Sequence, residues 1–104
     1  MEENKDLIGQ ATPDQISEWK KKYGKVSAII VDGHIAYFKK PDRKTLGYAS
    51  SIGTKDPIKF NETLMNNCFI GGSEEIKKND DLFLSASSKL GDLIEIREAE
   101  LVNL

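Results

Sequence analysis

The chain has 104 residues, a net charge of −2 and one cysteine, Cys68. This length suits one domain with a modest core, and the near-zero charge favours neither nucleic acid nor an anionic membrane as a general partner. The longest apolar run is too short to span a bilayer, one cysteine excludes an internal disulfide, and the acidic, polar start lacks the apolar stretch of a signal peptide, so we expect a cytoplasmic protein.

The first predicted element is a helix that begins after Thr12. Thr12 and Gln15 form a T-x-x-Q capping box, and Pro13 suits the first helical position. Trp19 lies on the apolar face of this helix. Gly24 favours the left-handed conformation that ends a helix.

Residues 26–39, VSAIIVDGHIAYFK, are predicted to form a β-hairpin. Asp32-Gly33 is a strong signal for a two-residue type I′ turn, in which both central residues have positive φ. The numbers of paired residues then sum to 65, so Ile30 faces Ile35. Both faces of the ribbon carry apolar side chains, and an isolated two-stranded ribbon is marginal in water. We therefore expect the helices to cover at least one face, and the second face or an open edge to be covered by another chain.

Three to four helices are predicted after the hairpin. Each follows a capping residue or a proline that favours a helix start, and Gly91 permits a kink or a break in the last one. They are expected at 43–52, 57–70, a short turn at 73–75, and 81–101. The order predicts a mainly helical α+β fold, with a flexible N-terminal arm over 1–11 and a single domain over 12–104.

The sequence shows no catalytic or metal-binding constellation. The only histidine, His34, lies beside the hairpin turn and is interpreted as a surface turn residue. Cys68 lies on the apolar stripe of a helix, away from the cationic or helix-start surroundings that activate a thiol. One cysteine and one histidine cannot form a closed zinc site. We therefore predict no enzymatic activity, no metal and no cofactor.

A basic cluster follows the hairpin. Lys39, Lys40, Arg43 and Lys44 bracket Pro41, with two tyrosines nearby. Basic residues interleaved with aromatic ones can hold a nucleic acid strand, although no recognised nucleic-acid motif is present. An acidic protein surface, in this chain or in another, is the favoured partner of the cluster.

Charge is unevenly distributed along the chain. Residues 1–18 carry a net charge of −4, residues 19–59 a net charge of +7 and residues 60–104 a net charge of −5. Such segregation indicates either a binding face or segments that neutralise one another within the fold.

The motifs DGHIAYFKKPDR, DPIKFNETL and LFL, in this order, resemble a family of small phage and prophage proteins from Bacteroides-type hosts. The functional class they are most similar to is the tail assembly chaperones of long-tailed phages. The resemblance spans about residues 13–98. It implies a soluble, non-enzymatic factor of the host cytoplasm that binds the tape-measure protein or tail-tube subunits before assembly.

The hairpin is the predicted partner-binding surface, because two apolar faces and free edges allow another chain to pack or pair with it. A structural virion component that uses the same hairpin remains an alternative, as does a small nucleic-acid-binding protein, and self-association is left open. The residues predicted to contact the partner are Ile29, Val31, Ala36 and Phe38, with Lys39, Lys40 and Arg43 as a charged rim.

Overall fold

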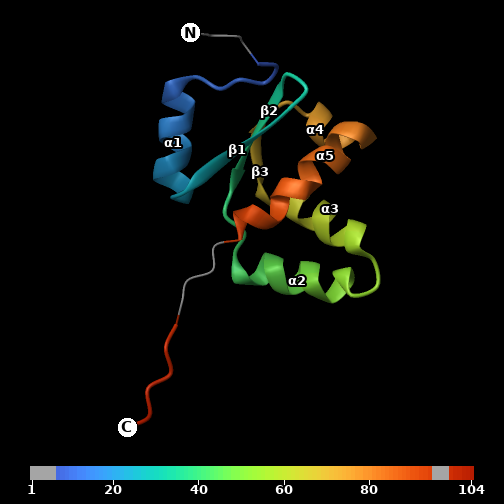
Figure 1. Cartoon of the computed structure of the whole chain (residues 1–104). Helices are drawn as coiled ribbons and strands as arrows, with labels where there is room; N and C mark the ends of the chain where they lie inside the picture. Colours follow the sequence, from blue (N-terminus) through green and yellow to red (C-terminus); the bar gives the residue numbers. More distant parts are fainter. Residues whose placement is uncertain (1–6, 95–98) are drawn as a thin grey trace.

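The computed structural model describes residues 7–94 and 99–104 of the chain. Within them, five α-helices and a three-stranded antiparallel sheet form an α+β fold dominated by helix, as predicted (Figure 1). The elements in chain order are α1 (Pro13–Tyr23), β1 (Val26–Val31), β2 (His34–Lys39), α2 (Arg43–Gly53), α3 (Pro57–Cys68), β3 (Phe69–Gly72), α4 (Glu75–Lys78), α5 (Asp80–Leu90) and the 3-10 turn η1 (Gly91–Leu93).

The hairpin of β1 and β2 has the predicted turn and register. Asp32 and Gly33 have φ values of 47° and 81°, as a type I′ turn requires. The strands pair from Val31 opposite His34 to Val26 opposite Lys39. The local sequence therefore determines this hairpin.

The structure has a third strand where the sequence predicts the end of a helix, at residues 69 and 70. α3 stops at Cys68, and Phe69 turns to an extended conformation with φ −64° and ψ 122°. The strand β3 pairs with β2 and makes β2 the central strand, in the order β1-β2-β3. Gly72 permits this pairing, because it has a φ of +108° and a Cβ there would lie 2.7 Å from the Cα of Ala36.

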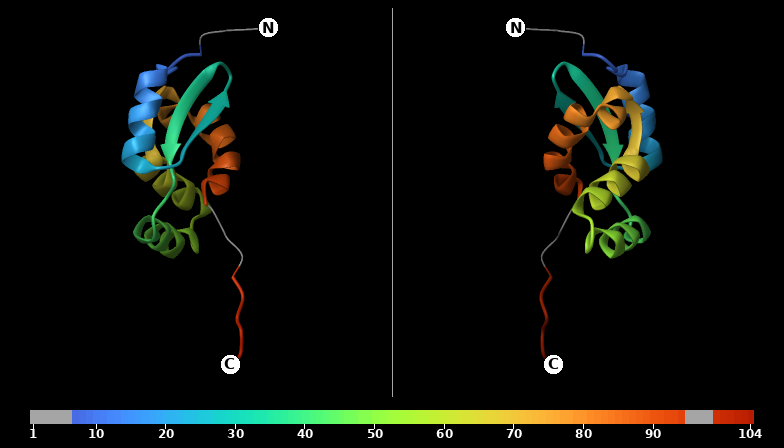
Figure 2. Two further views of the ribbon diagram at one scale, coloured as in Figure 1. Left: turned by 90° about the vertical axis from the view of Figure 1, so that its left-hand side faces the viewer. Right: turned by 90° about the vertical axis from the view of Figure 1, so that its right-hand side faces the viewer.

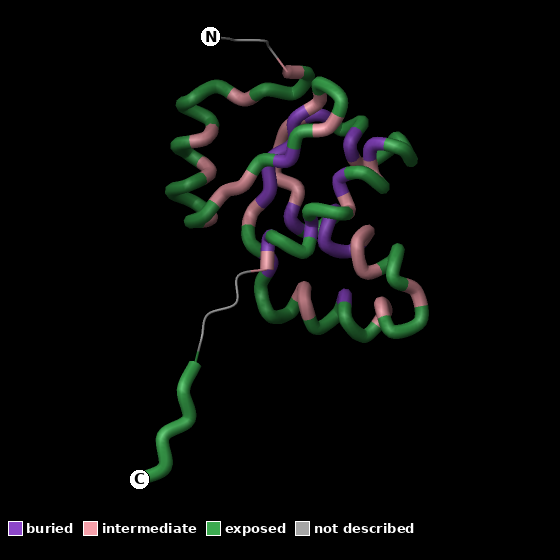
Figure 3. Tube along the Cα trace, in the orientation of Figure 1, coloured by how far each residue is buried: buried purple, intermediate pink, exposed green. Residues whose placement is uncertain are grey.

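Helices cover both faces of the sheet. On one face lies α1, where the Trp19 ring packs 5.1 Å from the ring of Tyr37. On the other face lie α3, α4 and α5, and α2 packs against α3 (Figure 2). Buried residues concentrate on β2 and on the helices that pack on the side of the sheet away from α1 (Figure 3). The core is thus built on β2.

The last helix is shorter than predicted. α5 ends at Leu90, and the chain continues as η1, whose Leu93 is buried. The regular helix therefore does not run on through residues 91–94: it breaks at Gly91, where the sequence permits a kink or a break, and Gly91 begins a tight turn. Residues 99–104 form no regular secondary structure, and the rest of the predicted helix, 95–98, lies outside the described residues.

Part of the predicted N-terminal arm is attached to the sheet. Residues 1–6 lie outside the described residues, but Ile8 forms a parallel bridge with His34. The N–H of Ile8 donates to the carbonyl of Gly33 at 2.8 Å, and the N–H of Ala11 donates to the hydroxyl of Tyr37 at 3.1 Å. Residues 8–11 are therefore anchored by hydrogen bonds to the hairpin.

Candidate functional site

Three of the residues predicted to contact a partner lie in the core. Ala36 and Phe38 have no exposed surface, and Ile29 is 7% exposed. Phe38 packs edge-on against Phe69, with ring centroids 5.7 Å apart. This corrects the prediction for these positions, because the hairpin face that carries them packs against α3 and α5 instead of another chain.

The strand β3 adds to this enclosure of the hairpin. It occupies the free edge of β2, while α1 covers the face of β2 that carries Ile35 and Tyr37. The strand β2 is therefore closed on both faces and both edges. Val31, the fourth predicted contact, is half-buried and packs against the core.

The exposed part of the hairpin lies on β1, at Ala28 and Ile30. Ile30 is 58% exposed, although it is a large apolar side chain in a strand. Both residues share the face opposite to Ile29, and both are exposed. Strand alternation in the sequence places Ala28 and Ile30 on one face, but it does not show which face the helices leave open.

The hydrogen bonds of β2 show which backbone groups of β1 face outward. The N–H of Ile35 donates to the carbonyl of Ile8, and its own carbonyl accepts from Ser73, both on the side away from β1. Ile35 is paired with Ile30, so this pair exchanges no hydrogen bonds. The backbone groups of Ile30, and by alternation those of Ala28, face the free edge. In the described part of the chain, nothing bonds to them.

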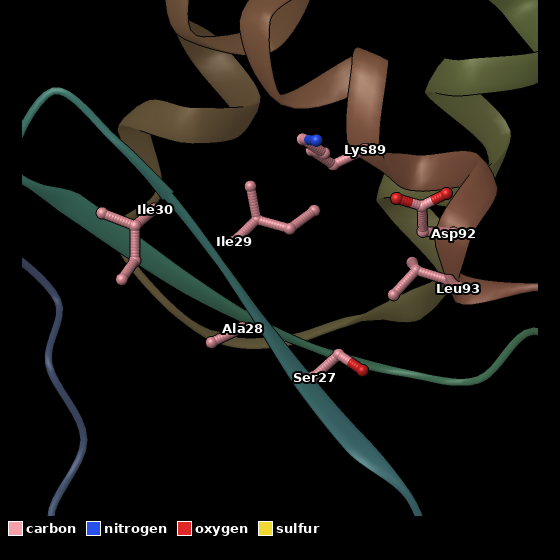
Figure 4. Close-up of a pocket in the computed structure, with 7 residues that line it drawn as sticks. All are labelled: Ser27, Ala28, Ile29, Ile30, Lys89, Asp92 and Leu93. Carbon is pink, nitrogen blue, oxygen red and sulfur yellow. The ribbon is translucent and has the colours of Figure 1, made fainter.

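A pocket of about 300 Å³ lies along this strand. It is formed between β1 and the end of α5 with η1, and its lining contains one positive and one negative side chain, Lys89 and Asp92 (Figure 4). In Figure 4, Ile29 points toward the α5 side, whereas Ile30 points away from it. The free edge of β1 thus has an apolar residue on one side and a small polar-rimmed pocket on the other. We call this surface, from Ser27 to Ile30, the β1 edge.

The predicted charged rim lies at the far end of the hairpin. Lys40 and Arg43 are exposed, while Lys39 is half-buried. The ammonium groups of Lys39 and Lys22 each lie 5.3 Å from the centroid of the Tyr23 ring, a distance typical of cation–π contacts. Part of the basic cluster therefore packs onto α1.

A second pocket, of about 320 Å³, lies among these basic residues. Asp42 lies in its wall together with Lys39 and Lys44, and its carboxylate accepts a 2.8 Å hydrogen bond from the N–H of Thr45. This hydrogen bond at the helix start lowers the pKa of Asp42, and the nearby lysines contribute in the same direction. The carboxylate therefore stays ionised and offsets part of the local positive charge.

His34 and Ser73 form the only close pair of a histidine with a hydroxyl among the described residues. His34 Nδ1 lies 2.8 Å from Ser73 Oγ, which also accepts a hydrogen bond from the N–H of Glu75. Ser73 is buried and begins the turn into α4. The pair thus joins the hairpin end to α4.

Cys68 is buried at the end of α3. Its burial raises the pKa of the thiol to about 11, so the reactive thiolate is scarce at neutral pH. Among residues 7–94 and 99–104, no group of three His, Cys, Asp or Glu side chains is placed to hold a metal ion.

No family model, curated protein or solved structure matches the chain. Within the described ranges, no helix has both the length and the apolar character needed to cross a bilayer.

Proposed function

We propose that the chain is a non-enzymatic assembly factor that binds an extended segment of another protein along the β1 edge. The resemblance of its motifs to phage proteins supports a tail-assembly-chaperone-like factor of the host cytoplasm. The proposed partner is the tape-measure protein or a tail-tube subunit.

The observation that carries the proposal is the unpaired edge of β1. Outward-facing backbone groups of Ala28 and Ile30 provide the hydrogen bonds that a further strand needs. Ile30 adds an exposed apolar contact, which is uncommon on an edge strand that must stay unpaired. The edge therefore favours a partner that adds a strand.

The geometry also indicates the chemistry of the bound segment. Neighbouring strands lie about 4.8 Å apart, and their side chains alternate between faces. A segment with apolar residues two positions apart would place them against Ala28 and Ile30, with short side chains toward the pocket beside Lys89. Apolar stretches of this kind aggregate when exposed, so covering them is a chaperone function.

Titration calorimetry of the purified chain against its tape-measure and tail-tube proteins tests the proposal. We expect Ile30→Asp to weaken binding tenfold or more, because it removes the apolar contact and places a charge on the edge. Leu84→Asp is the matched control, because Leu84 is exposed to a similar degree (55%) on α5 and should bind as the wild type does. Equal binding by wild type and Ile30→Asp contradicts the proposal, as does the lack of binding to either protein.

A structural virion component is the second candidate function, because the same edge could extend a neighbouring sheet in the assembled particle. Mass spectrometry of purified virions distinguishes the two. An assembly chaperone should be absent from them, whereas a structural subunit should be present in a fixed ratio to the tail-tube protein.

A further inference from the structure

The C-terminal segment Ala99–Leu104, AELVNL, is extended and apolar yet exposed. Leu101 is 92% exposed and Val102 is 65% exposed. Figure 1 shows this segment standing clear of the folded body. Its apolar side chains are therefore not covered by the chain's own described residues, and they are available to another surface.

We propose that the C-terminal segment of one copy adds a strand to the β1 edge of a second copy, so that two copies form a reciprocal dimer. This inference goes beyond the proposed function, because it makes a second copy the occupant of the β1 edge in the free protein. The partner segment of the proposed function must then displace it.

The spacing of side chains matches between the two surfaces. Val102 and Leu104 lie two positions apart, so both point to one side of an extended segment. Ala28 and Ile30 have the same spacing on β1. When the strands pair, Val102 and Leu104 lie across from Ala28 and Ile30 on one face, where apolar cross-strand pairs stabilise a sheet.

The length and exit point of the segment suit exchange between copies. Leu93 lines the pocket together with Ser27 of β1, so the chain leaves the body beside its own β1 edge. Ten residues follow Ile94, and their extended reach is about 33 Å. The six residues of β1 need only about 20 Å. The remainder can bridge to a second copy, and a two-fold axis then makes both exchanges identical.

Charge favours the same contact. Residues 95–104 contain three glutamates and one arginine. The start of β1 lies close in the chain to the basic end of α1, which carries Lys20, Lys21 and Lys22 in its last turn. When the segment adds parallel to β1, with Val102 opposite Ala28, Glu100 approaches this basic region, which steers association.

Analytical ultracentrifugation of the full-length chain tests the proposal. We expect a dimer whose dissociation constant rises at least tenfold in the double variant Val102→Asp/Leu104→Asp and in Ile30→Asp. The control Leu84→Asp should dimerise as the wild type does. Far-ultraviolet circular dichroism of each variant shows that the fold is retained. A wild type that stays monomeric at millimolar concentration overturns the proposal, and so does a dimer that both edge and tail variants leave unchanged.

Disulfide trapping tests the site directly. Copies with Leu104→Cys are mixed with copies that carry Ala28→Cys or Ile30→Cys, and at least one mixture should give a disulfide-linked heterodimer. Leu104→Cys mixed with Leu84→Cys is the matched control. The proposal is overturned if Leu104→Cys forms no disulfide with either Ala28→Cys or Ile30→Cys. It is also overturned if Leu104→Cys forms a disulfide equally well with Leu84→Cys. Because these measurements use no other protein, their result is independent of whether the tape-measure or tail-tube protein binds.

Discussion

Phe38 is predicted from the sequence to contact a partner, but the fold gives it a structural role in the core. Its sequence context is a strand that ends in lysines, which suits a contact residue at a rim. In the fold it has no exposed surface and packs against Phe69. A residue of this kind stabilises the monomer and does not serve as a binding residue.

Phe38→Ala should lower the free energy of unfolding by about 3–5 kcal/mol, because it removes a buried aromatic ring and leaves a cavity. Ile30→Ala is the comparison, because Ile30 is a similarly apolar residue on the exposed side of the same hairpin. It should cost less than about 1 kcal/mol. Urea denaturation of both variants measures the difference, and equal losses would place Phe38 outside the core.

Cys68 should make the free energy of unfolding fall as the pH rises above 9. Burial raises the pKa of its folded-state thiol to about 11, above the value near 9 of an exposed thiol. The thiol's contribution is complete below pH 9, where both states are protonated. It is lost as the pH rises toward 11, because the unfolded chain ionises first.

The measurement is the difference in unfolding free energy between the wild type and Cys68→Ala, followed as a function of pH. Lysines titrate equally in both proteins, so the pH dependence of this difference reports on Cys68 alone. We expect the difference to be constant from pH 6 to 8.5 and to shift against the wild type above pH 9. A difference that stays constant to pH 11 would contradict the burial of the thiol. Slow reaction of the native thiol with Ellman's reagent at pH 8 provides an independent check.

At the scale of elements, β3 decides the architecture. It has four residues, two of them glycines, and such a run carries little strand propensity. Gly71 is needed for the close packing of α1 on this strand. A Cβ at this position would lie only 2.6 Å from the nearest atom of the Trp19 ring. The strand is therefore held by its neighbours on both sides.

Gly71→Ala should lower the free energy of unfolding by about 1–3 kcal/mol, because the added methyl group displaces Trp19 in a packed interface. The matched control is Gly47→Ala on α2, where a Cβ meets nothing within 4 Å. There alanine should stabilise the helix by about 0.4–1 kcal/mol. Tryptophan fluorescence reports the first change directly, and an unchanged spectrum with unchanged stability would contradict the packing of α1 on β3.

At the scale of the whole molecule, the basic cluster has an aromatic contact and a negative charge of its own. Lys39 packs onto the Tyr23 ring, and Asp42 lies among the lysines of the basic cluster. The net charge remains −2. The exposed Tyr48 lines the same pocket as Lys39 and Lys44, but Asp42 interrupts the basic surface there. Single-strand binders instead use an uninterrupted basic groove with several aromatic residues.

We therefore expect no measurable affinity for single-stranded DNA or RNA at 150 mM salt. Fluorescence anisotropy with labelled oligonucleotides tests this at chain concentrations up to 50 μM. Binding that strengthens steeply as the salt is lowered, and that Arg43→Glu abolishes, would instead support the nucleic-acid alternative.

The sequence by itself determined the elements whose signals are local. The Thr12 capping box, the Asp32-Gly33 turn with its register, and the Asp42 cap all depend on residues within a few positions of one another. Each is present as predicted. The α+β class follows from their order along the chain.

Only the tertiary structure decided which part of the hairpin is open. Phe69 reaches Phe38 across 30 intervening residues, and no local pattern shows that this short strand will cover the edge of β2. The two faces of the hairpin are almost equally apolar, so their sequence cannot rank them. Packing of the helices ranks them, because it buries the four central residues of β2 and leaves Ala28 and Ile30 of β1 exposed.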